Sequence, residues 1–265
     1  MRLRGKVAII TGGGKGIGKA IALAFAREGA NVVIAARSAP ELEKTCGEII
    51  SKGGKAIYVQ TDVSDESQIK RLVAETIRRF DQVDILVNNS GVSGPTSRVV
   101  DMDLAQWNET LAVDLTGSMV CAREVLKNMI ERKTGNIINV VSEAGRSADG
   151  RSGYPFRAAY CCAKMGLIGL TETLSVEMGE YGIRVNALSP GPVLGDRIVN
   201  VIKKRVEGTG KTFDEIMTSL TANNSLKRLA TEEECAAVAV FLASEESSAV
   251  TGQTIPVSCG QHVNF

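Results

Sequence analysis

Histidine is almost absent from this chain of 265 residues, and the only one is His262, close to the C-terminus. A serine hydrolase needs a histidine base and often carries a G-x-S-x-G turn, and the sequence contains no such turn. The six cysteines do not occur in pairs with the spacing of metal ligands. The sequence therefore argues against hydrolase chemistry of this type, and we expect no metal site.

Excess charge of either sign is also lacking, with 31 basic and 30 acidic residues and a net charge of +1. This balance gives no reason to expect nucleic acid or an anionic membrane as a partner. No apolar run is long enough to span a bilayer, and the first expected strand begins at Lys6, which leaves no room for a signal peptide. We therefore expect a cytoplasmic protein that acts on a small molecule.

Short apolar stretches alternate with helical patterns along the chain. Stretches that are apolar on both faces are typical of strands in a parallel sheet covered by helices. The expected strands are 6–11, 31–36, 55–60, 83–88, 135–141, 183–188 and 253–257, and the expected helices are 17–28, 40–51, 65–80, 103–131, 158–181 and 232–243. This order predicts one α/β domain over residues 1–265, a Rossmann-like, doubly wound, mostly parallel seven-stranded sheet with helices on both faces.

A glycine-rich turn joins the first expected strand to the first helix. Glycines allow the backbone to approach a ligand closely, and the start of a helix offers free N–H groups and a positive dipole end to a pyrophosphate. We therefore expect a dinucleotide site here, with an ordinary strand–helix turn as the alternative. The residues of this turn are Gly12, Gly14, Lys15, Gly16, Ile17 and Gly18.

Tyr160 and Lys164 lie four positions apart in an expected helix, so their side chains share one face. A free tyrosine ionises at about pH 10, and a fixed positive charge nearby favours the phenolate. The pair therefore suits proton transfer to or from an alcohol. This spacing is common by chance, so the hypothesis depends on the other motifs.

Taken together, these segments resemble the classical short-chain dehydrogenase/reductase family. The resemblance implies a nicotinamide cofactor, interconversion of a carbonyl and an alcohol, and a homotetramer or homodimer packed through the helices at 103–131 and 158–181. It runs in order through Thr11–Gly18, Asp62-Val63, Asn88–Gly91, Ser142, Tyr160–Lys164 and Pro190–Val193.

The resemblance also implies roles for individual residues. Tyr160 would give or take the proton, Ser142 would hold the substrate oxygen, and Lys164 would support Tyr160 and bind the ribose of the nicotinamide. The other expected cofactor contacts are Asp62 and Val63 at the adenine, Asn89, Ser90 and Gly91 at its ribose, and Pro190, Gly191 and Val193 at the carboxamide.

The choice of cofactor depends on charge at the end of the second expected strand. An NAD site usually has a carboxylate there, whereas this strand ends in Ala36 and is followed by Arg37. Arg37 and Lys15 could both bind a 2′-phosphate, or they could be solvated surface charges. The sequence favours NADP(H), with NAD(H) as the alternative.

Three departures from the family pattern affect the predicted site. Asp114 stands where the family normally has an asparagine, and its extra charge near Lys164 would offset part of the lysine's influence on Tyr160. Gly195 stands where a threonine that contacts the nicotinamide is common. The segment between Ser142 and Tyr160 is also longer than usual, and its Tyr154, Phe156, Arg146, Arg151 and Arg157 could shape the substrate pocket or be solvated.

These observations predict an NADP(H)-dependent oxidoreductase that interconverts a carbonyl and a secondary alcohol, with a substrate lid near 195–227. A weakly active or inactive cofactor-binding subunit, motivated by Asp114, is the alternative. An NAD-dependent alcohol dehydrogenase of the same family is another.

Overall fold

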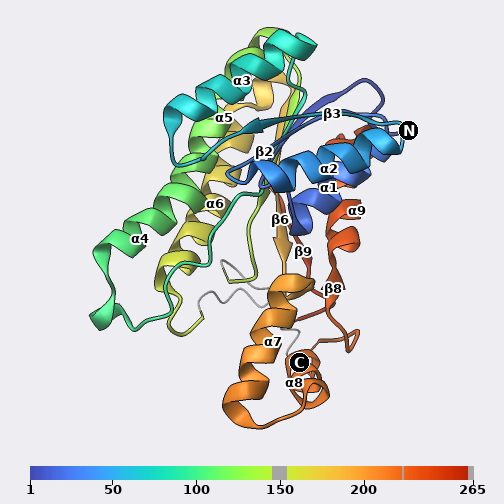
Figure 1. Cartoon of the computed structure of the whole chain (residues 1–265). Coiled ribbons are helices and arrows are strands. Elements are labelled where there is room, and N and C mark those ends of the chain that lie inside the picture. The colour runs from blue at the N-terminus through green and yellow to red at the C-terminus, as the bar shows by residue number, and fades with distance from the viewer. Residues whose placement is uncertain (145–153, 223, 262–265) are drawn as a thin grey trace.

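The computed structural model describes residues 1–144, 154–222 and 224–261 of the chain. Its centre is a seven-stranded sheet in the order β3-β2-β1-β4-β5-β6-β9, in which every neighbouring pair is parallel (Figure 1). This order confirms the predicted Rossmann-like sheet. The strands are β1 (Val7–Thr11), β2 (Asn31–Ala36), β3 (Lys55–Gln60), β4 (Ile85–Asn88), β5 (Gly135–Val140), β6 (Ile183–Pro190) and β9 (Thr254–Val257).

Helices cover both faces of the sheet, as the sequence predicts. α1, α2 and α9 share one apolar core with the sheet, and α3, α5 and α6 share another on the opposite face. The helices are α1 (Gly16–Arg27), α2 (Ala39–Ser51), α3 (Glu66–Phe80), α4 (Leu104–Leu111), α5 (Gly117–Arg132), α6 (Ala158–Glu177), α7 (Asp196–Thr209), α8 (Phe213–Thr221) and α9 (Glu232–Ala243).

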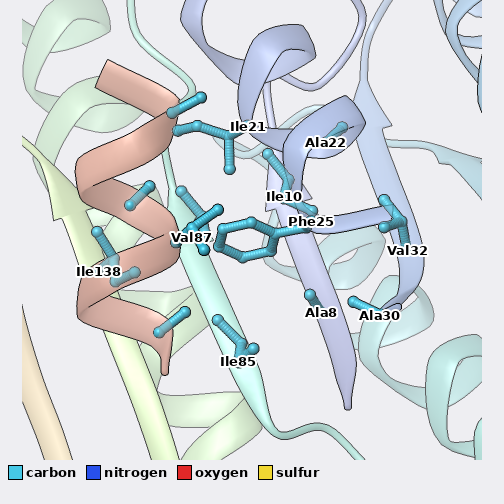
Figure 2. Close-up of a cluster of buried hydrophobic side chains, with 14 of the residues drawn as sticks. Ala8, Ile10, Ile21, Ala22, Phe25, Ala30, Val32, Ile85, Val87 and Ile138 are labelled. Carbon is cyan, nitrogen blue, oxygen red and sulfur yellow. The ribbon is translucent and has the colours of Figure 1, made fainter. Parts of the chain in front are cut away.

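The first strand shows why its sequence is apolar throughout. All five residues of β1 are buried, because successive side chains point to opposite faces and both faces are covered. Ile10 joins the core under α1 and α9, whereas Ile9 joins the core under α3 and α5. Figure 2 shows Phe25 of α1 lying against the sheet between Ile10 and Val87. The strand thus connects the two cores and fixes where its C-terminal end, Thr11, meets the glycine turn.

The long helix expected at 103–131 is interrupted. A π-helical turn, Ala112–Thr116, separates α4 from α5 and contains Asp114. An inserted residue of this kind changes the apolar pattern of the sequence very little, so periodicity could not reveal it. The helix expected at 158–181 also ends earlier, at Glu177, and a 3₁₀ turn, Gly179–Tyr181, follows it. Gly182, with φ of +68°, then leads the chain into β6.

A small second sheet lies beyond the carboxyl end of β6, which the sequence did not predict. β7 (Val193–Leu194) pairs in parallel with β8 (Ala230–Thr231). In the chain, α7 and α8 lie between β7 and β8, and they project from the main body in Figure 1. They fall within the predicted lid near 195–227, whose movement stays a prediction.

No helix of the described residues is long and apolar enough to cross a membrane.

Apolar side chains are exposed on the two helices expected to pack between subunits, namely Met119 on α5 and Met165 and Val176 on α6. The homo-oligomer stays a prediction.

We predict that Phe25→Ala destabilises the fold strongly. Phe25 is completely buried, and large-to-small changes at such sites cost about 3–5 kcal/mol of unfolding free energy because they leave a cavity. Chemical denaturation of both proteins measures this difference. Phe241→Ala, at a side chain 36% exposed on α9, is the control and should cost less than about 1 kcal/mol. Equal losses would contradict the described core.

Candidate active site

The glycine turn is folded tightly against itself. Gly12 and Gly16 have φ of +66° and +58°, values that residues with a Cβ rarely adopt. A Cβ on Gly18 would lie 2.3 Å from the carbonyl oxygen of Gly12 and 2.4 Å from Nδ2 of Asn89. Larger residues at these positions would therefore force the turn apart. The helix that follows, α1, has no acidic residue in its first turn, and Lys15 at its N-cap makes no side-chain capping hydrogen bond.

Asn89 and Ser90 tie this turn to the end of β4. The hydroxyl oxygen of Thr11 accepts hydrogen bonds from the backbone N–H groups of Asn89 and Ser90, each at 3.0 Å. Nδ2 of Asn89 donates in return to the carbonyl oxygen of Thr11 at 3.0 Å. The structure thus gives Asn89 a structural role at the predicted cofactor cleft.

Lys164 is a buried cation at the point where α6 meets β5. Lys164 is only 4% exposed, and its Nζ donates to the carbonyl oxygen of Val140 at 3.1 Å. The same Nζ lies 5.7 Å from the centroid of the Tyr160 ring and 3.7 Å from Oδ2 of Asp114. The structure therefore brings together three residues that the sequence predicted to be neighbours.

The π-helical turn places Asp114 beside this lysine. Asp114 is completely buried, and its Oδ1 accepts from the backbone N–H of Val92 at 2.7 Å. A Cβ on Gly91 would lie 3.3 Å from Oδ2, so the backbone after β4 also packs closely against the carboxylate. The carboxylate consequently links the segment after β4 to Lys164, and its negative charge is held next to the ammonium.

Arg157 is a second cation at Tyr160. Its guanidinium carbon lies 4.9 Å from the centroid of the Tyr160 ring, and Nη2 donates to the carbonyl oxygen of Ser93 at 2.7 Å. The sequence suggested only that Arg157 could shape the substrate pocket or be solvated. The spacing of three positions from Tyr160 was the signal that could have predicted this ring contact.

Ser142 follows β5, at the edge of the sheet where ligands bind in open α/β folds. Its Oγ accepts from the backbone N–H of Ala144 at 3.1 Å, which orients the side chain. The next residue, Glu143, donates its backbone N–H to the carbonyl oxygen of Pro190 at 3.1 Å. This bond joins the segment after β5 to the Pro190–Val193 segment after β6.

The expected 2′-phosphate site is open to solvent. Arg37 is exposed after β2, and Lys15 forms an exposed ion pair with Glu41 at 3.2 Å. Such a pair contributes about 0–1 kcal/mol, so Lys15 can exchange this partner for a phosphate. Burial raises the pKa of Asp62, but hydrogen bonds from Ser64 and the charge of Arg37 outweigh it, so that this pKa is lowered. Asp62 is therefore a carboxylate at neutral pH, with Val63 buried next to it.

The segment before α6 contacts the segment after β4. Ser97 donates its backbone N–H to the carbonyl oxygen of Phe156 at 3.0 Å, which holds Phe156 at φ of +65°. Tyr154 and Phe156 are 39% and 54% exposed, so both could contact a ligand. Arg146, Arg151 and His262, which the sequence singled out, lie outside the described residues.

These residues fit a dinucleotide. The N–H groups at the start of α1 suit a diphosphate, and Tyr160 and Lys164 lie near the carboxyl end of β5 in the same sheet, where ligands bind in open α/β folds. Within the described ranges, no group of three or more histidine, cysteine, aspartate or glutamate side chains is arranged to hold a metal ion. All six cysteines are free, and four of them are buried.

Comparisons with known proteins extend over almost the whole chain. A family model described as enoyl-(acyl carrier protein) reductase matches residues 12–262. A 3-oxoacyl-(acyl-carrier-protein) reductase of Synechocystis sp. is 36% identical over 260 residues, which cover 97% of each chain. Glucose 1-dehydrogenase 2 of Bacillus subtilis is 37% identical over 260 residues, which cover 97% of this chain and 95% of that protein.

Solved structures show the same fold. The structure of levodione reductase superimposes with a TM-score of 0.91 at 31% identity and covers both chains fully. A structure of NAD+-bound xylitol dehydrogenase (TM-score 0.90, 29% identity) covers 98% of this chain and 100% of its own. A variant of actinorhodin polyketide ketoreductase with NADPH (TM-score 0.89, 32% identity) covers 98% of each chain. These matches show that the chain belongs to the short-chain dehydrogenase/reductase family of nicotinamide-dependent oxidoreductases.

Proposed function

We propose that this protein is an NADP(H)-dependent oxidoreductase that interconverts a carbonyl and a secondary alcohol, with Tyr160 as the acid and base. The observation that carries the proposal is the position of Lys164. Its ammonium is almost fully buried, anchored to the end of β5 and 5.7 Å from the centroid of the Tyr160 ring. A cation held this way stabilises the phenolate that forms when the phenol gives up its proton.

Tyr160 and Ser142 have different roles in the proposed reaction. In carbonyl reduction, Tyr160 gives its proton to the substrate oxygen, and in alcohol oxidation it removes that proton. The hydroxyl of Ser142, whose oxygen already accepts from Ala144, is free to donate to the same substrate oxygen as negative charge develops there. The nicotinamide cofactor, when bound, supplies or accepts the hydride.

The surface around Tyr160 supports a substrate of small or medium size with apolar parts. Tyr154 and Phe156 expose aromatic surface next to the helix that carries Tyr160. Burial raises the pKa of the Tyr154 phenol, and the charge of Glu143 adds to this rise, so Tyr154 stays protonated at neutral pH. The exposed part of the Tyr154 ring can offer a substrate an aromatic face.

Charge favours NADP(H) over NAD(H). Arg37 and Lys15 place two exposed cations near the end of β2, where NAD-binding members of this fold usually place a carboxylate. Guanidinium groups bind phosphate with two charge-assisted hydrogen bonds. The relatives do not decide the matter, because one related structure holds NAD+ and another holds NADPH.

One observation favours the second candidate, a weakly active or inactive cofactor-binding subunit. The Asp114 carboxylate lies 3.7 Å from Nζ of Lys164 and offsets part of the positive charge that Tyr160 experiences. Arg157 restores a positive charge at the ring, at 4.9 Å from its centroid. We therefore prefer the active enzyme.

The proposal predicts that Tyr160→Phe loses turnover while the protein still binds cofactor. Loss of a general acid or base typically lowers the rate about 10²–10⁴-fold. The measurement is nicotinamide absorbance over a panel of carbonyls and alcohols, with cofactor binding followed by fluorescence. Tyr181→Phe, in the 3₁₀ turn after α6, is the matched control and should keep wild-type rates. Unchanged turnover in Tyr160→Phe would reject the assignment.

Asp114→Asn tests the charge next to Lys164. The amide keeps an oxygen for the N–H of Val92 but removes the negative charge, so phenolate should form at lower pH. We expect the rise of alcohol oxidation with pH to move to lower pH. Asp101→Asn, at an exposed surface ion pair, should leave the profile in place. Superimposable profiles for Asp114→Asn and wild type would show that this carboxylate does not act on Tyr160.

Cofactor preference is tested by Arg37→Gln. A lost charge-assisted hydrogen bond costs about 1.5–3 kcal/mol, so kcat/KM for NADPH should fall roughly ten- to hundredfold, with little change for NADH. Arg71→Gln removes another exposed cation near the end of β3 and should change neither value. A wild-type enzyme that uses NADH as efficiently as NADPH would overturn the preference.

A further inference from the structure

Glu232 lies against the start of α1. It is the first residue of α9, and the capping box between Thr231 and Glu234 fixes the backbone at that point. A Cβ on Gly16, the first residue of α1, would lie 3.8 Å from Oε1 of Glu232. The carboxylate oxygen is therefore next to the helix end at which a diphosphate is expected to bind.

Gly195 leaves the space that this carboxylate occupies. A Cβ on Gly195 would lie only 2.3 Å from the same Oε1, so any other residue would displace the Glu232 side chain. The parallel pairing of β7 with β8 brings the two segments together, because Leu194 pairs with Thr231 directly before them. Gly195 has an extended backbone that any residue could adopt. A glycine at this position is therefore explained by the space it leaves for Glu232 and not by its backbone conformation.

The helix end attracts this carboxylate. α1 has no acidic residue in its first turn, so the positive end of its dipole has no anion from its own sequence. Oε1 of Glu232 comes from a different helix and lies near that end, 3.8 Å from where a Cβ on Gly16 would be. A dinucleotide diphosphate is also an anion that binds at such a helix end. The two negative groups would therefore repel each other.

We propose that Glu232 couples dinucleotide binding to proton uptake: its carboxylate lies beside the first residue of α1, and it takes up a proton from solvent when a diphosphate binds at that helix end. This inference rests on the proposed function, because it assumes that the glycine turn holds the cofactor. It goes further by naming a residue that makes cofactor affinity depend on pH.

The surrounding charges set the direction of this dependence. Burial raises the pKa of Glu232, the carboxylates of Glu233 and Asp196 raise it further, and the ammonium of Lys19 opposes them. Lys19 is itself engaged with Glu48 at 2.7 Å. A bound diphosphate adds more negative charge and raises the pKa of Glu232 again, so binding takes up a proton. Affinity must therefore fall as pH rises through the titration of Glu232 in the free protein.

The test is calorimetric titration of the cofactor-free protein with NADPH across pH, in buffers with different heats of ionisation. Wild type should take up a fraction of a proton on binding and bind more weakly at higher pH. Glu232→Gln should take up less and, at the upper end of the range, should bind on the order of tenfold more tightly. The 2′-phosphate of NADPH titrates in the same way for both proteins, and NADH, which lacks it, serves as a second probe.

Glu233→Gln is the matched control, because it removes one charge from an exposed side chain at the next position of α9. Glu233→Gln should reproduce at most a small part of the change in proton uptake and cofactor affinity. Glu232→Ala should lower proton uptake and raise affinity, as Glu232→Gln does. Equal affinity and equal proton uptake in wild type and Glu232→Gln would overturn the inference while leaving the proposed function intact. Failure of wild type to bind either cofactor would overturn both.

Discussion

The arrangement of the site depends on one buried positive charge. An ammonium group removed from water is costly unless it has partners, and Lys164 has a backbone carbonyl, a carboxylate and an aromatic ring around it. Those partners belong to β5, to the π-helical turn and to α6 itself. The need to satisfy this one cation therefore constrains how three elements meet, and the same constraint fixes the position of Tyr160.

The charges around Tyr160 act together. Asp114 lowers the net positive charge near the phenol, while Arg157 adds a second cation on its ring. A sequence comparison that considers only the departure at Asp114 would expect weakened chemistry. The structure supplies a compensating group from the turn before α6, which explains why an active oxidoreductase remains the better proposal. A carboxylate also lies at the diphosphate end of the cleft. There Gly195, which has no side chain, leaves room for the carboxylate of Glu232 from another helix.

The regular parts of the fold could be predicted because local sequence decides them. Residues 6–11 were expected as a strand and the structure gives Val7–Thr11, since a short run that is apolar on both faces is typical of a covered parallel strand. Tyr160 and Lys164 were expected on one helical face for a similarly local reason. The π-helical turn at Asp114 could not be predicted, because one inserted residue hardly changes the periodicity of apolar residues along the helix. The contact of Glu232 with Gly195 was hidden as well, because it arises from the pairing of β7 with β8, segments that are distant in the chain.

The most direct test of the role of Lys164 and Tyr160 is a crystal structure of the protein with NADP+ and a bound secondary alcohol. We expect the diphosphate to lie at the start of α1 and Nζ of Lys164 to contact the hydroxyls of the nicotinamide ribose. We also expect the phenol oxygen of Tyr160 to lie within hydrogen-bond distance of the alcohol oxygen. A nicotinamide ring bound away from Tyr160, or an alcohol held by other residues, would contradict these roles.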